Sequence, residues 1–221
     1  MKFKSLFLVL AAVVLLGAAP AWADMTAGFY GTPDVFNVSL ANILADTGVM
    51  PYTGLNSQNN QSLGGQYRSL VVSDPSNVFC AGCLDFVYGA SDTGGPDAIG
   101  YVTASSFGGF KIDAGVASNL VTGGGAGDIA PIDVSVGVGG VVVTWEFPGA
   151  TGVPTGYETA VLVVETNATS WTGGTFAVID SGTTNLPAFQ PSVPEPATIV
   201  LLVSMLGVVG LGLRKRVINL V

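Results

Sequence analysis

The stretch Asp133-Val134-Ser135-Val136-Gly137-Val138 decides the fold class, because its valines alternate with polar or small residues. Successive side chains of a strand point to opposite faces of a sheet, so this period of two predicts a β-strand with one buried face. The continuous apolar runs Val141-Val142-Val143 and Val161-Leu162-Val163-Val164 are typical of central strands covered on both sides. The sequence therefore predicts an all-β domain.

Further candidate strands recur between glycine-rich turn signals such as Gly94-Gly95 and Gly173-Gly174. The candidate strands cover residues 35–40, 67–72, 84–88, 99–105, 132–138, 141–147, 160–166 and 175–179. About eight short strands favour two facing sheets, which predicts an antiparallel β-sandwich of Greek-key or jelly-roll type. Residues 37–45 are also compatible with a short helix.

The C-terminal end combines a short motif, an apolar run and a basic cluster. Val193, Pro194, Glu195 and Pro196 precede an uncharged apolar run over residues 197–213. As a helix rising ~1.5 Å per residue, this run would reach roughly 25 Å, at the short end of what crosses a hydrocarbon core. We therefore expect one C-terminal transmembrane helix.

A basic stop follows the apolar run at Arg214, Lys215 and Arg216. Basic residues favour the cytoplasmic side of a membrane, so the rest of the chain is expected outside the cell. Motif, run and basic stop together form a sorting signal over residues 193–216, with a short tail over 217–221. The alternative is an ordinary single-span anchor.

This order of motif, span and basic stop resembles the PEP-CTERM signal of exported bacterial proteins, which a membrane-embedded exosortase recognises. The resemblance implies an inner-membrane-anchored precursor that is cleaved between Pro196 and the basic residues. The mature protein would then be released, or attached to the outer surface or the extracellular matrix.

The N-terminal end has the pattern of a secretory signal peptide. Lys2 and Lys4 precede an apolar run over 6–19, and Ala21-Trp22-Ala23 is a small-x-small cleavage site. We expect a hydrophobic signal helix within residues 1–23, removed by signal peptidase between Ala23 and Asp24. An uncleaved N-terminal anchor is the alternative.

Between these ends we expect a β-sandwich domain over residues 24–185 and a proline-rich linker over 186–192. Fourteen of the 15 acidic residues of the chain lie between Asp24 and Gln190, against two basic ones, so this part has a net charge of −12. A surface of this charge repels phosphate backbones, which excludes nucleic acid as a partner.

Three stretches resemble a recurring group of PEP-CTERM proteins that share an LDFVY strand, an F-x-G-F segment and a late TNAT segment. Here they are Phe79 to Tyr88 with Leu84-Asp85-Phe86-Val87-Tyr88, then Ser105 to Phe110, and Ala160 to Asp180 with Thr166-Asn167-Ala168-Thr169. The resemblance implies export and a shared β-fold, and it transfers no functional residue beyond the sorting motif.

The two cysteines form a Cys80-x-x-Cys83 motif. In an exported chain an oxidised pair is expected, and its use would be to fix the turn before the strand at Leu84. Free thiols and a redox role are the alternatives, but a thioredoxin-like motif needs a helix at this position. Zinc is disfavoured, because the chain has no histidine and two cysteines do not fill a tetrahedral site.

The absence of histidine also excludes Ser-His-Asp and Cys-His catalysis, so we expect no enzyme. A glycosidase needs only two carboxylates, so this class of enzyme stays possible.

Calcium is the one candidate cofactor, because Asp92 and Asp97 place two carboxylates in one turn. Turn formation alone also explains these two residues. Most of the aromatic residues are expected in the core, and Trp145 lies inside an apolar strand. The candidates for a sugar-stacking platform are Tyr30, Tyr52, Trp145, Tyr157 and Trp171. Among these, Trp171 stands beside a Gly-Gly turn and is the expected glycan contact.

The sequence thus predicts an exported protein of the cell surface or of the exopolysaccharide matrix of a biofilm, with a non-enzymatic structural or adhesive role. A carbohydrate-binding module and a two-carboxylate polysaccharide hydrolase are the alternatives. The expected partners are signal peptidase, an exosortase-type enzyme, the inner membrane before processing and extracellular polysaccharide.

Overall fold

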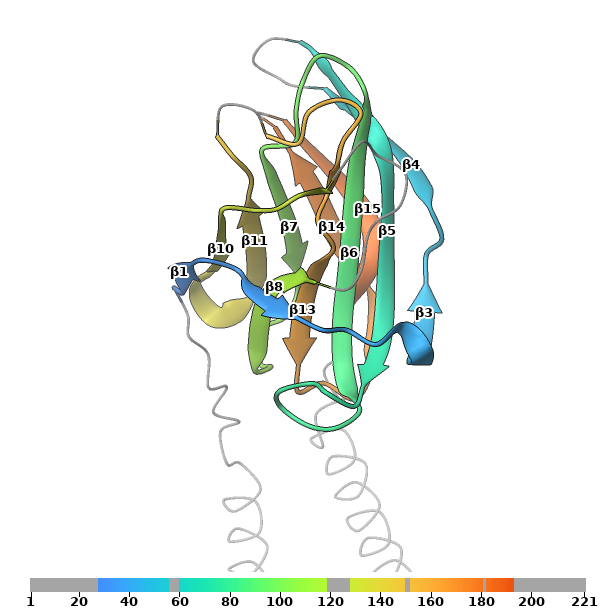
Figure 1. The fold of residues 1–221 in the computed structure, drawn as a ribbon, viewed down its shortest axis with the longest axis vertical. Coiled ribbons are helices and arrows are strands. Elements are labelled where there is room, and N and C mark those ends of the chain that lie inside the picture. Colours follow the sequence, from blue (N-terminus) through green and yellow to red (C-terminus); the bar gives the residue numbers. More distant parts are fainter. Residues whose placement is uncertain (1–27, 56–59, 119–127, 150–151, 181, 193–221) are drawn as a thin grey trace, which may run out of the picture.

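The computed structural model describes residues 28–55, 60–118, 128–149, 152–180 and 182–192, and these residues form an all-β fold (Figure 1). The strands are β1 (Tyr30–Gly31), β2 (Asp34–Phe36), β3 (Ile43–Asp46), β4 (Met50–Leu55), β5 (Ser62–Asp74), β6 (Cys83–Gly94), β7 (Tyr101–Ser105), β8 (Ile112–Ala117), β9 (Asp128–Ile129), β10 (Asp133–Val136), β11 (Val142–Glu146), β12 (Glu158–Thr159), β13 (Leu162–Thr166), β14 (Trp171–Ile179) and β15 (Thr183–Pro191). Two short 3-10 turns, η1 (Leu40–Asn42) and η2 (Val138–Gly140), interrupt them. The all-β prediction is confirmed.

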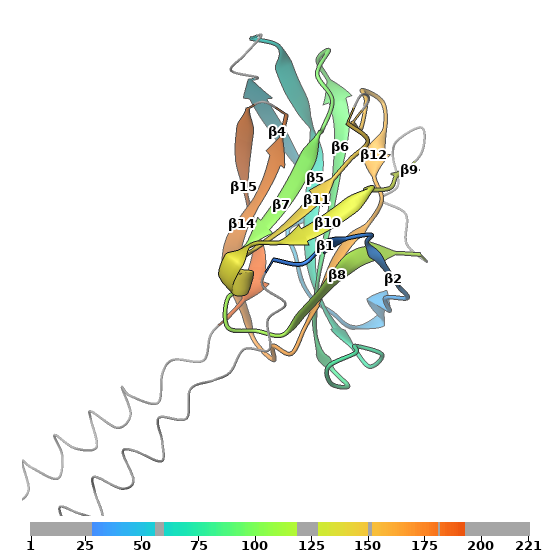
Figure 2. The same ribbon diagram turned by 90° about the vertical axis from the view of Figure 1, so that its left-hand side faces the viewer.

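The strands form two sheets. The six-stranded sheet has the order β1-β10-β11-β7-β14-β15, and in Figure 2 its β1–β10 edge faces the viewer. The nine-stranded sheet has the order β2-β8-β13-β6-β12-β9, and β5 joins β6 to β3 and β4. Pairing is antiparallel except for β2 with β8 and β9 with β12.

An aromatic core joins the two sheets. The ring of Tyr88 on β6 stacks on that of Phe176 on β14, with centroids 5.2 Å apart, and lies 6.3 Å from the ring of Trp145 on β11. The indole nitrogen of Trp145 donates a hydrogen bond of 3.1 Å to the carbonyl of Gly115 on β8. Because buried aromatic rings supply a large apolar area, these contacts fix how the sheets face one another.

The alternating stretch behaves as predicted up to Val136. Val134 and Val136 are buried, whereas Val138 is 91% exposed because β10 ends at Val136 and the chain turns into η2. Leu162, Val163 and Val164 of the 161–164 run lie on β13, which is central between β6 and β8 and buried at every residue.

Three local predictions are wrong. Strand β11 is central but covered on one face only, because its outward residues, such as Val142 and Thr144, are half-buried. The helix expected over 37–45 is limited to η1, after which the chain enters β3. The linker expected over 186–192 is β15, which pairs with β14 along its whole length. Pro187 and Pro191 fit there because β15 is an edge strand and needs no donor on its open side.

The segment 34–42, which we call the strap, crosses the outer face of the nine-stranded sheet (Figure 1). Its Phe36 and Val38 are buried against Leu70, Val87 and Val163 in a second, smaller core. Ser39 on the strap donates its backbone N–H to the Asp74 carboxylate at 3.2 Å, which fixes the far end of the segment.

Several predictions fall outside the described residues. They are the signal peptide with its Ala23–Asp24 cleavage site, the sorting motif from Val193 to Pro196, the transmembrane helix over 197–213 and the basic stop at Arg214, Lys215 and Arg216. In the described part of the chain, no helix is long and apolar enough to cross a membrane.

Candidate functional site

The outer face of the six-stranded sheet is exposed and carries two tyrosine–carboxylate pairs. Tyr30 donates its hydroxyl to Asp133 at 2.9 Å, and Tyr101 donates its hydroxyl to Glu146 at 3.4 Å. Asp133 on β10 and Glu146 on β11 are directly paired, and Glu146 is in turn paired with Tyr101 on β7. The two pairs are therefore neighbours on one exposed surface, which we call the tyrosine face.

A row of small hydroxyl side chains extends the tyrosine face across four strands. Tyr30 on β1 pairs with Ser135, Ser135 with Thr144, and Thr144 with Thr103. Side chains at directly paired positions point to the same side of a sheet, so these hydroxyls form one continuous row. Each hydroxyl can donate and accept a hydrogen bond.

Alternation within each strand builds this surface. In β7 the order Tyr101-Val102-Thr103-Ala104-Ser105 places valine and alanine in the core and the polar residues outside. Tyr30 is 64% exposed and Tyr101 is 41% exposed. The hydrogen bond to Asp133 raises the pKa of Tyr30, so its ring stays neutral in physiological conditions.

The expected aromatic platform is only partly correct. Tyr52 and Trp145 are buried in the core, as expected for most of these rings, so neither contributes to a platform. Trp171 lies on the same face as Tyr101, at the far end of β14, and is 37% exposed. Tyr157 lies near Asp92 at the end of β6, apart from this surface. Sequence reasoning missed Tyr101, although its alternation with Val102 and Ala104 indicated an outward position.

The chemistry of the tyrosine face suits contact with an extended, uncharged polymer. Aromatic rings provide apolar area with a polar tip, hydroxyl rows provide donors and acceptors, and no basic side chain stands among the residues that compose it. An open sheet surface contacts a chain along its length, whereas small molecules are usually held in concave pockets.

A second cluster of polar groups lies on the nine-stranded sheet and is buried. Asp113 on β8 pairs with Glu165 on β13, and Glu165 pairs with Asp85 on β6. Burial is the main cause that raises the pKa of Asp85 to about 8; the Asn77 hydrogen bond opposes this shift, and nearby Glu165 and Asp74 contribute to it. Burial, followed by the Asp34 carboxyl, raises the pKa of Asp113 to about 6. Asp85 and Glu165 are inaccessible to a polymer, so this row is structural.

The pKa of the neighbouring Asp74 carboxyl is shifted in the opposite direction. Burial raises its pKa, but donors from Ser76 and from the Ser39 backbone outweigh burial and lower the pKa overall. A proton on Asp85 can bond to this charged carboxylate, which explains how Asp85 Oδ2 is tolerated without any other donor.

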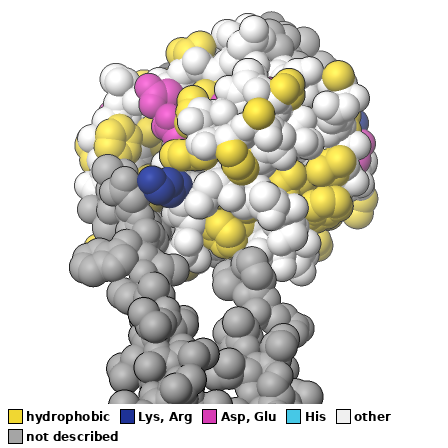
Figure 3. Space-filling view, turned by 90° about the horizontal axis from the view of Figure 1, so that it is seen from below, with side chains coloured by type: hydrophobic (Ala, Val, Ile, Leu, Met, Phe, Trp, Pro, Cys, Tyr) yellow, Lys and Arg dark blue, Asp and Glu magenta, His cyan; other side chains and the backbone are white. Residues whose placement is uncertain are grey.

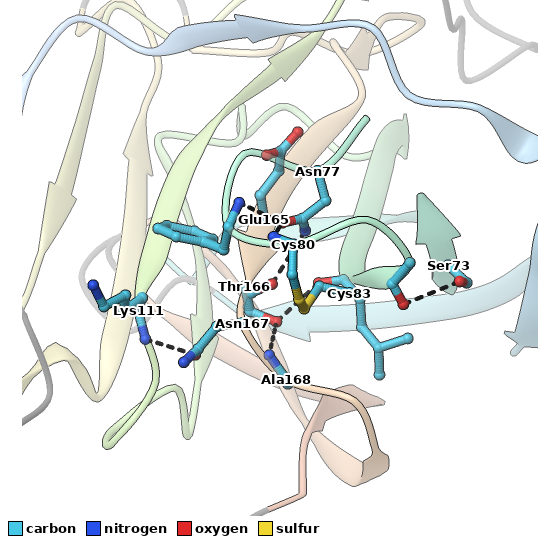
Figure 4. Close-up of a disulfide and its surroundings, with 12 residues drawn as sticks. Ser73, Asn77, Cys80, Cys83, Lys111, Glu165, Thr166, Asn167 and Ala168 are labelled. Atoms are coloured by element: carbon cyan, nitrogen blue, oxygen red, sulfur yellow. Dashed lines mark hydrogen bonds between the residues drawn. A yellow bond between two sulfur atoms is a disulfide. The ribbon is translucent and has the colours of Figure 1, made fainter. Parts of the chain in front are cut away.

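Cys80 and Cys83 form a disulfide next to this carboxyl row (Figure 4). Their Cα atoms are 5.3 Å apart, and the motif is followed directly by strand β6 rather than by a helix. Asn77 Nδ2 donates to Asp85 at 2.7 Å, and Gly82 donates its N–H to the Asp74 carbonyl at 2.9 Å. Hydrogen bonds before and after Cys80 therefore fix the loop that carries the disulfide. A redox-active Cys-x-x-Cys motif instead stands at the start of a helix.

The late Thr166-Asn167-Ala168 segment packs against the same strand. Thr166 donates its hydroxyl to the Leu84 carbonyl at 2.8 Å, and Leu84 donates its N–H to the Ala168 carbonyl at 3.0 Å. Two of the stretches that resemble the PEP-CTERM group therefore meet in space. Their shared role is structural, because most of their polar groups are occupied by one another.

Asp92 and Asp97 are both buried, as members of the turn proposed for calcium. Asp92 accepts hydrogen bonds from the Gly94 backbone at 3.1 Å and the Thr155 hydroxyl at 3.3 Å, whereas Asp97 Oδ2 has no partner. Burial is the main cause that raises the pKa of Asp92 to about 6. Over the described ranges, no group of three or more acidic or cysteine side chains is arranged to hold a metal ion. Calcium binding by this turn stays a prediction.

Comparison with known proteins bears on the C-terminus. Residues 192–216 match the model of the PEP-CTERM protein-sorting motif. No curated protein and no solved structure matches the chain. The matched residues include the Pro-Glu-Pro motif, the apolar run and the basic stop, so the motif implies export through a membrane-anchored sorting signal. The chain therefore carries a PEP-CTERM sorting motif, which supports its sorting to the cell surface as an exosortase substrate.

Proposed function

We propose that the exported domain is a non-enzymatic, adhesive component of the bacterial surface or its exopolysaccharide matrix, and that the tyrosine face binds polysaccharide. The observation that carries the proposal is the pair of neighbouring contacts from Tyr30 to Asp133 and from Tyr101 to Glu146 on an exposed sheet face. The carboxylates hold the two tyrosine hydroxyls in place, so little side-chain freedom is lost when a ligand stacks on the rings.

The acidic surface supports a neutral or basic polymer as the ligand. The net charge of −12 between Asp24 and Gln190 repels polyanions, and the hydroxyl row from Ser135 to Thr103 matches the donors and acceptors of a sugar chain. Binding along a surface rather than in a pocket also suits a matrix component, because several copies can hold one polymer with modest affinity at each site.

The experiment measures binding of the protein to the extracellular polysaccharide of its host. The protein is purified in detergent from a strain that lacks the exosortase, so that the sorting signal stays attached. Tyr30→Ala and Tyr101→Ala should each weaken binding by about tenfold, which corresponds to about 1.4 kcal/mol. Tyr157→Ala is the matched control, because Tyr157 is similarly exposed, at 37%, and lies off the tyrosine face. Equal affinity in all four proteins would refute the assignment of the tyrosine face.

A two-carboxylate hydrolase is the second candidate, and the direct pairing of Asp133 with Glu146 favours it. Glycosidases need two carboxyl groups on opposite sides of the scissile bond. The same binding experiment separates the two functions if released reducing ends are followed. We expect binding without release; release that is abolished in Glu146→Gln but not in Tyr101→Ala would identify a hydrolase.

A further inference from the structure

The sorting motif fixes which end of the domain lies nearest the membrane. Strand β15 ends at Pro191, and Ser192 is still held by a 2.9 Å hydrogen bond from its N–H to the Ser170 carbonyl. Five backbone steps separate Ser192 from Ala197, where the uncharged run begins. At about 3.3–3.6 Å per residue, five steps span at most roughly 17 Å.

The end of the domain beside Ser192, which we call the exit end, is therefore held close to the bilayer in the precursor. Strands β5 and β13 end there, and β6 and β14 begin there, so it consists of the loop 75–82 and the residues around Trp171. The polar interface of a bilayer is roughly 5–8 Å thick on each side, which is less than the reach of the connecting residues.

Apolar side chains are exposed at the exit end. Val78 at the tip of the loop 75–82 is 60% exposed, and Trp171 stands opposite Pro191, the last residue of β15. The η2 turn adds Val138 at the rim, because β11 begins at the same end as β14. Figure 3 looks at the molecule from this side and shows hydrophobic side chains spread over a mostly uncharged surface that also carries an acidic patch and a basic patch.

The charges at the exit end also suit a membrane. The carboxyl groups of Asp74, Asp85 and Glu165 are buried rather than displayed, although the domain as a whole is strongly acidic. One of its two basic residues, Lys111, is exposed beside Asn167 at this end (Figure 4). An indole ring beside apolar side chains is the typical composition of protein at a membrane–water interface.

We propose that the exit end rests on the outer surface of the lipid bilayer while the sorting signal is still attached, with Val78 and Trp171 in the headgroup region. The tyrosine face then extends away from the membrane along β7 and β11, and its aromatic rings other than Trp171 stay free for a polymer. Release of the domain from the bilayer would expose Trp171, so this residue contacts lipid first and is available for other contacts only after processing.

The experiment uses the full chain reconstituted in vesicles of phosphatidylethanolamine and phosphatidylglycerol. A photoreactive phenylalanine analogue replaces Val78 or Trp171 at the exit end, or Ile132 or Tyr157 at the opposite end as exposed controls. Lipid adducts measured by mass spectrometry should be several-fold more abundant at positions 78 and 171 than at positions 132 and 157.

A flexible Gly/Ser insert of roughly 20 residues between Ser192 and Val193 separates docking from tethering. If the exit end has its own affinity for lipid, the selective adducts at positions 78 and 171 persist with the insert. Equal adduct yields at both ends, or a selectivity that disappears with the insert, would overturn the proposal. Either outcome leaves the polysaccharide proposal untouched, because that binding is measured in detergent.

Discussion

At the scale of single residues, Asp85 makes the folded state sensitive to pH. Its carboxyl is fully buried, and burial raises its pKa to about 8. An unfolded aspartate has a pKa of about 3.9, so between these two values the folded state holds a proton that the unfolded state has lost. The contribution of Asp85 to the stability of the folded state is therefore most favourable below pH 4, and it is lost as the pH rises towards 8.

Asp85→Asn should remove this dependence, because an amide is neutral at every pH and can keep hydrogen bonds to Asn77 and Asp74. We expect the variant to match the wild type near pH 4 and to be more stable at pH 9 by on the order of a few kcal/mol, at about 1.4 kcal/mol per pKa unit. Urea unfolding at several pH values measures the difference. A difference that does not grow with pH would show that Asp85 is charged in the folded protein.

Asp46→Asn is the matched control with the opposite sign. The hydrogen bond from Arg68 is the main cause that lowers the pKa of Asp46, and the two side chains form an ion pair of 2.7 Å at the surface. Their contribution is present at neutral pH and is lost as the pH falls below the ordinary aspartate range. The variant should therefore lose up to about 1 kcal/mol at pH 7 and converge with the wild type in acid.

At the scale of secondary-structure elements, the strap depends on the absence of a side chain at Gly115. A Cβ atom at this position would lie 2.0 Å from the carbonyl oxygen of Asp34, where β2 runs parallel to β8. The Gly115 carbonyl also accepts the hydrogen bond from Trp145 across the core. One glycine on β8 therefore contacts the strap on one side and the opposite sheet on the other.

Gly115→Ala should displace the strap and destabilise the protein by about 1–3 kcal/mol, as overpacking does in a well-packed core. Chemical denaturation measures the loss, and hydrogen exchange should show faster exchange at Phe36 and in the β8 strand. Gly173→Ala on β14 is the control, since a Cβ atom there meets nothing within 4 Å. Equal effects of the two substitutions would mean that loss of glycine in a strand, and not the strap contact, is responsible.

The comparison of sequence and structure also belongs to this scale. Short strands with a clear period, such as β7 and β10, follow from side-chain alternation alone. The length of β5 (Ser62–Asp74) could not be predicted, because the adjacent Gly64 and Gly65 indicate a turn. In the structure these glycines instead allow another strand to approach closely. A Cβ atom at Gly65 would lie 1.7 Å from the Ser91 carbonyl oxygen. The final strand β15 was hidden by its prolines, which an edge position tolerates.

The tyrosine face shows why a site is harder to predict than a strand. Tyr30, Tyr101 and Asp133 are each ordinary residues in their own segments, and only the order β1-β10-β11-β7 brings them together. Pairing between strands so far apart in the sequence leaves no local signal. The predicted turn beside Trp171 is wrong, because Gly173 and Gly174 lie inside β14 and pair with Phe189 and Ala188. Trp171 is nevertheless 37% exposed, because it is the first residue of β14 and lies at an outward position.

At the scale of the whole molecule, the sorting motif and the fold together indicate which end of the domain lies nearest the membrane. The match over residues 192–216 begins one residue after β15 ends, so the folded domain continues to the start of the sorting signal without a spacer. The domain therefore stays within roughly 17 Å of the start of the apolar run while the sorting signal is attached. We expect the maturation of the chain to determine when its exit end becomes accessible.

Intact mass and fractionation of the protein from its host test that maturation. We expect a species that begins at Asp24 and lacks Arg214, Lys215 and Arg216, found outside the inner membrane. Simultaneous Pro194→Ala, Glu195→Ala and Pro196→Ala substitutions should leave the full C-terminus in the inner membrane, because they remove the motif and keep the apolar run intact. If wild type and variant both retain the full C-terminus there, the run is an ordinary anchor and the domain stays at the bilayer. The exit end would then be a permanent membrane contact, and adhesion through the tyrosine face would occur at the inner-membrane surface rather than in the matrix.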